Sequence, residues 1–206
     1  MENETGWGDP ALSHRNASKY MTLLPDPRLG VLAVLLVAAA VSDVRTHRIP
    51  NALVFGGALY GLAYHAFFPP VPGEAGILVA LGGLGVGLAG LLPLYLLRVM
   101  GAGDVKLMAM AGAFLGASGA FCALLATLVA GGVLAIAFTL ATGRVVAMLR
   151  NVLAVCRGTM VSLATGVGGL AVHDGPSAGR MPYAVAIAAG TIAYLIAVQF
   201  GWLKGA

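Results

Sequence analysis

The chain has 206 residues, of which 59% are hydrophobic and only 10% are charged, and its formal net charge is +4. Globular domains carry roughly 25% charged residues, so this composition excludes a soluble globular protein and indicates a membrane protein. The positive charge does not indicate a nucleic-acid surface, because Lys and Arg in a membrane protein mark its cytoplasmic loops.

The first apolar segment follows a polar N-terminal tail, residues 1–28, whose acidic and basic side chains nearly balance. We expect a membrane-spanning helix over residues 29–44, with Asp43 near its end at the cytoplasmic rim of the bilayer. An Ala-x-Ala sequence inside this segment leaves a cleaved signal peptide as the alternative. The uncleaved helix is favoured because the tail has no excess of positive charge and arginines directly follow the segment.

A short basic turn, residues 45–51, separates this helix from the next apolar segment. Pro50 cannot continue a helix, and Asn51 is the expected N-cap of a second span over residues 51–68. The arginines of the turn indicate that it faces the cytoplasm.

The third predicted span, residues 75–97, follows a proline-rich turn at 69–74 that contains no basic residue. The span is rich in glycine and includes Gly83-x-x-x-Gly87. Small residues at this spacing let transmembrane helices approach closely. We therefore interpret these two glycines as a helix-packing surface.

Residues 107–143 form an uncharged stretch of 37 residues. As one helix it would be ~55 Å long, well beyond a hydrocarbon core of ~30 Å. The stretch must therefore fold back, and the small residues 116–119 are the expected turn. This gives spans four and five.

Residues 143–180 are basic and are predicted to form a cytoplasmic loop with helices that lie on the membrane surface. A short additional span over 160–172 is the alternative. The last span is predicted over residues 181–203. The sequence thus predicts an all-α polytopic membrane protein with about six transmembrane helices, and residues 29–203 form a single domain.

The basic residues of the internal loops all lie on one side of this topology, and the turns on the other side contain none. The eight residues are Arg45, Arg48, Arg98, Lys106, Arg144, Arg150, Arg157 and Arg180. The positive-inside rule assigns this side to the cytoplasm. Asp43 and Asp104 lie on the same side.

Asp43 and Asp104 are acidic residues at the edge of the bilayer, where an ionisable side chain is costly and is by default a functional hypothesis. Each has a structural alternative. Asp43 could form an ion pair with Arg45 or Arg48, and Asp104 could be the N-cap of the fourth helix. As a pair on the same side and at the same depth, they favour acid–base chemistry on a peptide bond.

The residues around Asp104 are candidates for shaping the site or binding substrate. Gly101 and Gly103 precede the aspartate, and glycine allows backbone conformations and close approaches that a side chain would block. An extended substrate strand could then lie beside the loop. Lys106 could attract or repel substrate charges, although a lysine that reaches toward the headgroups needs no such role.

No metal or cofactor is expected at this site. The two cysteines, Cys122 and Cys156, form no CxxC motif and have no nearby histidine, so they do not indicate a zinc site. A pair of carboxyl groups can act on a peptide bond without a metal.

Three segments of the chain carry a resemblance to the type IV prepilin peptidases. Residues 42–51, SDVRTHRIPN, and residues 101–107, GAGDVKL, resemble the two aspartate motifs of that family. Residues 181–188, MPYAVAIA, are similar to the C-terminal signature of its small branch, which serves Flp-type, tight-adherence pili.

The resemblance implies an intramembrane aspartic endopeptidase of the bacterial inner membrane, with Asp43 and Asp104 as its catalytic pair and no metal. Such an enzyme cuts the short basic leader from a prepilin, after a glycine and on the cytoplasmic side. The partners implied are the prepilin, whose leader precedes a hydrophobic helix, and the lipid bilayer; the oligomeric state stays open. Larger family members carry an N-terminal domain with paired CxxC motifs and methyltransferase activity, which is not expected here.

The alternative function is a proton- or cation-coupled transporter that uses the same two aspartates. Many transporters are built from inverted repeats, and the sequence contains no convincing internal repeat. The peptidase interpretation is therefore favoured.

Overall fold

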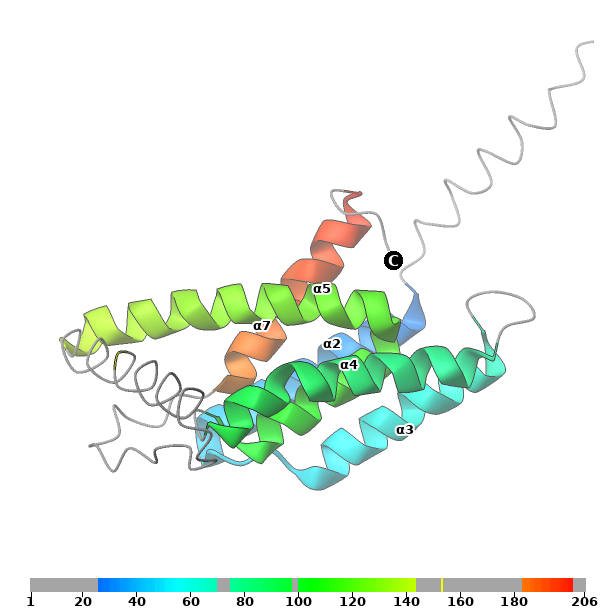
Figure 1. Cartoon of the computed structure of the whole chain (residues 1–206), viewed down its shortest axis with the longest axis horizontal. Helices are drawn as coiled ribbons and strands as arrows, with labels where there is room; N and C mark the ends of the chain where they lie inside the picture. Colours follow the sequence, from blue (N-terminus) through cyan, green and yellow to red (C-terminus); the bar gives the residue numbers. More distant parts are fainter. Residues whose placement is uncertain (1–25, 70–74, 98–99, 144–152, 154–182, 202–206) are drawn as a thin grey trace, which may run out of the picture.

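In the computed structural model of the chain, the described residues are 26–69, 75–97, 100–143, 153 and 183–201. They form five helices, namely α2 (Pro27–Thr46), α3 (Asn51–Phe67), α4 (Gly76–Leu96), α5 (Ala102–Thr142) and α7 (Tyr183–Gln199) (Figure 1). Within these ranges there is no strand. The predicted all-helical class is confirmed.

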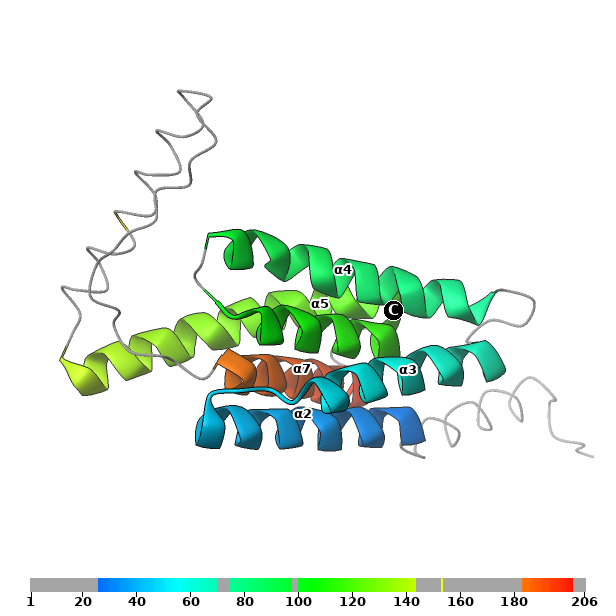
Figure 2. The ribbon, with the colours of Figure 1, turned by 90° about the horizontal axis from the view of Figure 1, so that it is seen from below.

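Helix α5 reverses its direction at Gly116. This residue has φ 73° and ψ 176°, a conformation outside the helical region that glycine adopts far more readily than other residues. Figure 2 shows the segments before and after Gly116 running back along each other. A Cβ atom at Gly112 would lie 3.3 Å from the Cβ atom of Ala120, although residues eight apart in one continuous helix are ~12 Å apart along its axis. The predicted fold-back is therefore present, and Gly116 alone makes it.

Three of the helices, α2, α4 and α5, are long and apolar enough to cross a membrane by length and composition, and α7 is a shorter apolar helix. Their length and apolar composition support the prediction of a membrane protein. The total of six spans stays a prediction. So does the cytoplasmic loop at 143–180, because the described residues include only Gly143 and Leu153 from it.

Helix α2 is longer than predicted, since it begins at Pro27 and ends at Thr46 rather than covering 29–44. Its start is stabilised by Asp26, whose Oδ1 accepts a hydrogen bond from the backbone N–H of Arg28 (3.2 Å). Proline suits the first position of a helix, because the N–H that it lacks has no partner there. The polar residues before the apolar run therefore belong to the helix.

The turn between α2 and α3 is held by side chains of α2. The hydroxyl groups of Ser42 and Thr46 both donate hydrogen bonds to the carbonyl oxygen of Arg48, at 3.0 and 3.1 Å. The prediction that Asn51 is the N-cap of α3 is wrong: Pro50 occupies that position, and Asn51 is the first helical residue. Pro50 has φ −61° and ψ 125°, so the proline itself sets the extended conformation from which the helix starts.

The first segment of α5, from Ala102 to Leu115, lies at the centre of the bundle. From Asp104 to Phe114 every residue except Lys106 is buried. A helix that is apolar on all sides must be surrounded by other elements, and α5 packs against α2, α3, α4 and α7. Asp104 therefore lies in the first turn of the most enclosed helical segment of the described bundle.

Helix α4 packs against this central segment through glycines. A side chain at Gly83 would overlap the carbonyl oxygen of Gly112, and one at Gly87 would overlap that of Met108. The backbones of the two helices thus approach as closely as the sequence pattern predicted. The predicted packing role of both glycines is confirmed.

A polar cluster ties the start of α2 to the end of α3. The Arg28 Nε atom lies 2.6 Å from Asp26 Oδ2 in an ion pair, and the hydroxyl of Tyr64 donates a hydrogen bond to Asp26 Oδ1 (3.3 Å). The Arg28 guanidinium also lies 3.2 Å from Nε2 of the buried His65, and Nδ1 of this histidine lies 3.0 Å from the carbonyl oxygen of Gly61. A guanidinium group only donates and a carbonyl oxygen only accepts, so these two partners fit the tautomer of His65 that has its proton on Nδ1.

Candidate active site

Asp43 lies on the buried face of α2. The buried residues of this helix recur at helical spacing as Leu32, Leu36, Ala39 and Asp43, and Asp43 is only 8% exposed. Its Oδ2 accepts a hydrogen bond from the backbone N–H of Ala184 (3.2 Å). Ala184 is the second residue of α7, where backbone N–H groups are free and the helix dipole is positive. The start of α7 therefore holds the Asp43 carboxylate.

The structure does not support the alternative that Asp43 pairs with an arginine of the following turn. Among the described residues the one ion pair joins Arg28 and Asp26. Arg45 and Arg48 are both exposed, whereas Asp43 is buried. The helical spacing turns Asp43 toward α7 and leaves Arg45 exposed, and Arg48 lies beyond the end of α2.

Asp104 is the third residue of α5 and is also 8% exposed. Its Oδ2 accepts a hydrogen bond from the backbone N–H of Gly101 (3.3 Å), and its own N–H donates to the carbonyl oxygen of Gly101 (3.2 Å). The alternative that Asp104 is the N-cap is therefore wrong, because Gly101 occupies that position. Asp104 instead caps the helix start from its third position, as the acidic partner of a capping box does.

The fold brings the two aspartates together at one end of the bundle. The end of α2, the start of α5 and the start of α7 lie at this end (Figure 2), and α2 is in contact with both other helices. The carboxyl groups of Asp43 and Asp104 are close enough for their charges to interact. Two buried carboxyl groups in this arrangement can divide the roles of proton donor and proton acceptor.

The glycines before Asp104 do not need the conformational freedom of glycine in this structure. Gly101 has φ −80° and ψ 154°, values that any residue adopts. A Cβ atom at Gly101 would lie 3.5 Å from Asp104 Oδ2, and one at Gly103 would lie 3.4 Å from the side chain of Ile49, which are ordinary contact distances. Their role in admitting a substrate strand stays a prediction.

Lys106 contacts the start of α3. Its Nζ donates a hydrogen bond to the Asn51 side-chain oxygen (3.4 Å) and lies 5.4 Å from the centre of the Phe55 ring. Its charge therefore has partners within the protein. A role toward substrate stays a prediction.

Helix α7 contributes two groups that the sequence analysis did not assign to the site. Besides the N–H of Ala184, the phenol of Tyr183 lies within electrostatic range of Asp104. Both residues belong to the segment 181–188, which carries the third resemblance. That segment was the sequence signal for them, although it gives no contact between distant helices.

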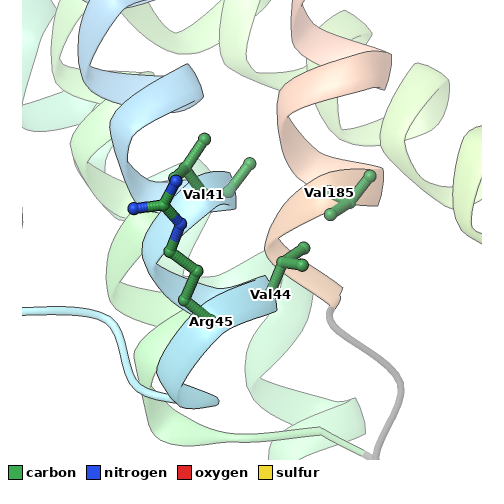
Figure 3. Close-up of a pocket in the computed structure, with 5 residues that line it drawn as sticks. Val41, Val44, Arg45 and Val185 are labelled. Atoms are coloured by element: carbon green, nitrogen blue, oxygen red, sulfur yellow. The ribbon is translucent and has the colours of Figure 1, made fainter.

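An open apolar pocket of about 380 Å³ lies between the end of α2 and the start of α7 (Figure 3). Val44 directly follows Asp43 and Val185 directly follows Ala184 in the sequence, although neither aspartate lines the pocket. The pocket is lined by Ala40, Val41, Val44, Arg45 and Val185. Within the described part of the chain, no group of three or more His, Cys, Asp and Glu side chains is placed to hold a metal ion.

One of the comparisons with known proteins identifies a family for the chain. The sequence pattern of the type IV leader peptidase family matches residues 30–136, more than half of the chain, and this range includes both Asp43 and Asp104. No curated protein and no solved structure matches the chain. Since the match extends over most of the helical bundle and both aspartate segments, the chain belongs to the type IV leader peptidase family.

Proposed function

We propose that the chain is an intramembrane aspartic endopeptidase that removes the short basic leader from Flp-type prepilins at the cytoplasmic face of the bacterial inner membrane. The observation that carries this proposal is the meeting of Asp43 and Asp104. They come from different helices, both are buried, and their charges interact at one end of an apolar bundle. The family match gives the class of reaction, and the resemblance of residues 181–188 to the small branch supports the Flp-type substrate.

The proposed mechanism needs only the two carboxyl groups and a water molecule. Two carboxyl groups this close do not both ionise readily, so one holds a proton at neutral pH. The ionised group takes a proton from water as the water oxygen attacks the scissile carbonyl carbon. The protonated group donates its proton to the carbonyl oxygen, and a proton then passes to the leaving amine as the C–N bond breaks.

Leader cleavage in a purified system tests the proposal. We expect the protein, reconstituted in lipid vesicles with a Flp-type prepilin, to shorten the prepilin by its leader, as measured by intact mass. A secreted protein with an ordinary signal peptide serves as the control and should stay uncut. If the prepilin keeps its full mass while protons or cations cross the vesicle membrane, the transporter alternative is correct and the peptidase proposal is wrong.

The proposed orientation predicts the outcome of reporter fusions. Fusions at Thr46, Met100 and Cys156 should report the cytoplasm, and fusions at Pro72 and Ser118 the opposite side, because the internal loops have eight basic residues on one side and none on the other. Alkaline phosphatase, which is active only outside the cytoplasm, and a fluorescent protein, which is active inside it, give the two readouts. Phosphatase activity at Met100 would place both aspartates on the wrong face for a leader peptidase.

A further inference from the structure

The first two residues of α7, Tyr183 and Ala184, each lie near one of the two aspartates of the site. The backbone N–H of Ala184 donates a hydrogen bond to Asp43 (3.2 Å), and the neighbouring Tyr183 places its half-buried phenol within electrostatic range of Asp104. Tyr183 and Ala184 are adjacent in the chain, so the positions of the phenol and of this N–H group are coupled. Small changes in the start of α7 therefore act on both carboxyl groups together.

The phenol of Tyr183 packs against Gly131 of α5. A Cβ atom at Gly131 would lie 2.6 Å from the hydroxyl oxygen of Tyr183 and 3.0 Å from the ring carbon that carries it. The first distance is shorter than real Cβ contacts and the second is at their tight limit, so an added methyl group would displace the phenol. Gly131 is thus the residue that leaves room for this phenol. The next residue, Gly132, has no atom within 4 Å of the corresponding position.

We propose that Tyr183 is a positioning residue for the peptidase reaction: its hydroxyl, seated over Gly131, orients the side chain of Asp104 while the Ala184 N–H holds Asp43. This inference rests on the proposed function. One Asp104 oxygen already accepts a hydrogen bond from the Gly101 N–H, and the phenol of Tyr183 is a second group within electrostatic range of the same carboxyl group. In enzymes without substrate such contacts are often long, and they tighten when substrate binds.

The test compares Tyr183→Phe with Tyr194→Phe. The first change keeps the ring and its packing but removes the hydroxyl, and the second removes a buried hydroxyl farther along the same helix. We expect Tyr183→Phe to lower kcat for leader cleavage by about 10- to 100-fold while KM changes by less than about twofold, because the group acts on the reacting state rather than on substrate binding. Tyr194→Phe should leave both constants near the wild-type values.

A second pair of variants tests the contact between the phenol of Tyr183 and Gly131. Gly131→Ala should reproduce the loss in kcat, because its methyl group displaces the hydroxyl of Tyr183, whereas Gly132→Ala should not. The two changes are the same substitution at adjacent positions of one helix, so an effect of helix propensity would appear in both. Equal kcat values for Gly131→Ala and Gly132→Ala would overturn the inference.

Infrared spectra give a readout that does not depend on substrate. The carboxyl bands of the pair can be assigned by their loss in Asp43→Asn and Asp104→Asn. The Asp104 band should shift in Tyr183→Phe and not in Tyr194→Phe. An unchanged band together with wild-type kcat in Tyr183→Phe would show that the phenol only packs, and would overturn this inference alone. Absence of cleavage by the wild-type protein would instead overturn the proposed function, and the inference with it.

Discussion

Asp43→Asn and Asp104→Asn are each expected to abolish leader cleavage, by about 10⁴-fold or more, while the protein stays in the membrane. Asparagine has the size of aspartate but neither ionises nor carries a proton through the reaction. Its side-chain oxygen can still accept the hydrogen bond from Ala184 or from Gly101. The bundle should therefore keep its structure and lose only the chemistry. Cleavage is measured as the fraction of prepilin without its leader in cells that have no other prepilin peptidase.

Asp26→Asn is the matched control for these two changes. Asp26 is an aspartate at the start of α2, where it caps the helix and pairs with Arg28. Asparagine is an equally good N-cap, so this variant loses a charge but keeps the helix start, and it should cleave normally. The variant that combines both catalytic substitutions should be no worse than either one, because groups that act as a unit are not additive. Cleavage that survives both single substitutions would exclude the aspartic peptidase mechanism.

Gly83→Ala should give a large loss of stability, because it adds a methyl group where α4 packs directly against the backbone of α5. The new methyl group would overlap the carbonyl oxygen of Gly112, and backbone atoms cannot rotate away as a side chain does. Inserting a methyl group into a close-packed interface typically costs about 1–3 kcal/mol of unfolding free energy, and a contact with backbone should lie at the upper end of that range. Gly112→Ala should cost about the same, because its methyl group would overlap the carbonyl oxygen of Gly83.

Gly85→Ala provides the comparison on the same helix. A Cβ atom at Gly85 meets no atom within 4 Å, and alanine is a better helix former than glycine by about 1 kcal/mol. This variant should therefore unfold at the wild-type temperature or above it, whereas Gly83→Ala should unfold below it. Thermal unfolding in detergent, followed by circular dichroism, measures the difference. Equal midpoints for the two variants would show that α4 is free to move away from α5, contrary to the packing described here.

The sequence alone predicted the helices well, because a membrane imposes simple requirements on each segment separately. An uncharged run that crosses a membrane must be helical, and its length is limited by the thickness of the bilayer. Residues 107–143 are too long for one crossing, so a reversal within them was predicted, and the structure places it at Gly116. The spacing of Gly83 and Gly87 predicted a close contact between helices, because small residues let transmembrane helices approach each other closely. The start of α2 was less well predicted. Asp26 caps the helix and Pro27 is its first residue, and hydropathy does not show that these residues extend the helix, because neither is strongly apolar.

Within the candidate site, the sequence identified Asp43 and Asp104 because charged residues beside apolar spans are rare and costly. It did not determine their partners. Arg45 lies two residues from Asp43 in the sequence but on the outer side of the helix, whereas Ala184, which donates a hydrogen bond to Asp43, comes from the last helix. Tyr183 over Gly131 is likewise a contact between segments far apart in the chain. Periodicity and hydropathy are properties of one segment in its solvent, whereas such contacts depend on how several helices pack at once, and only the tertiary structure decides that.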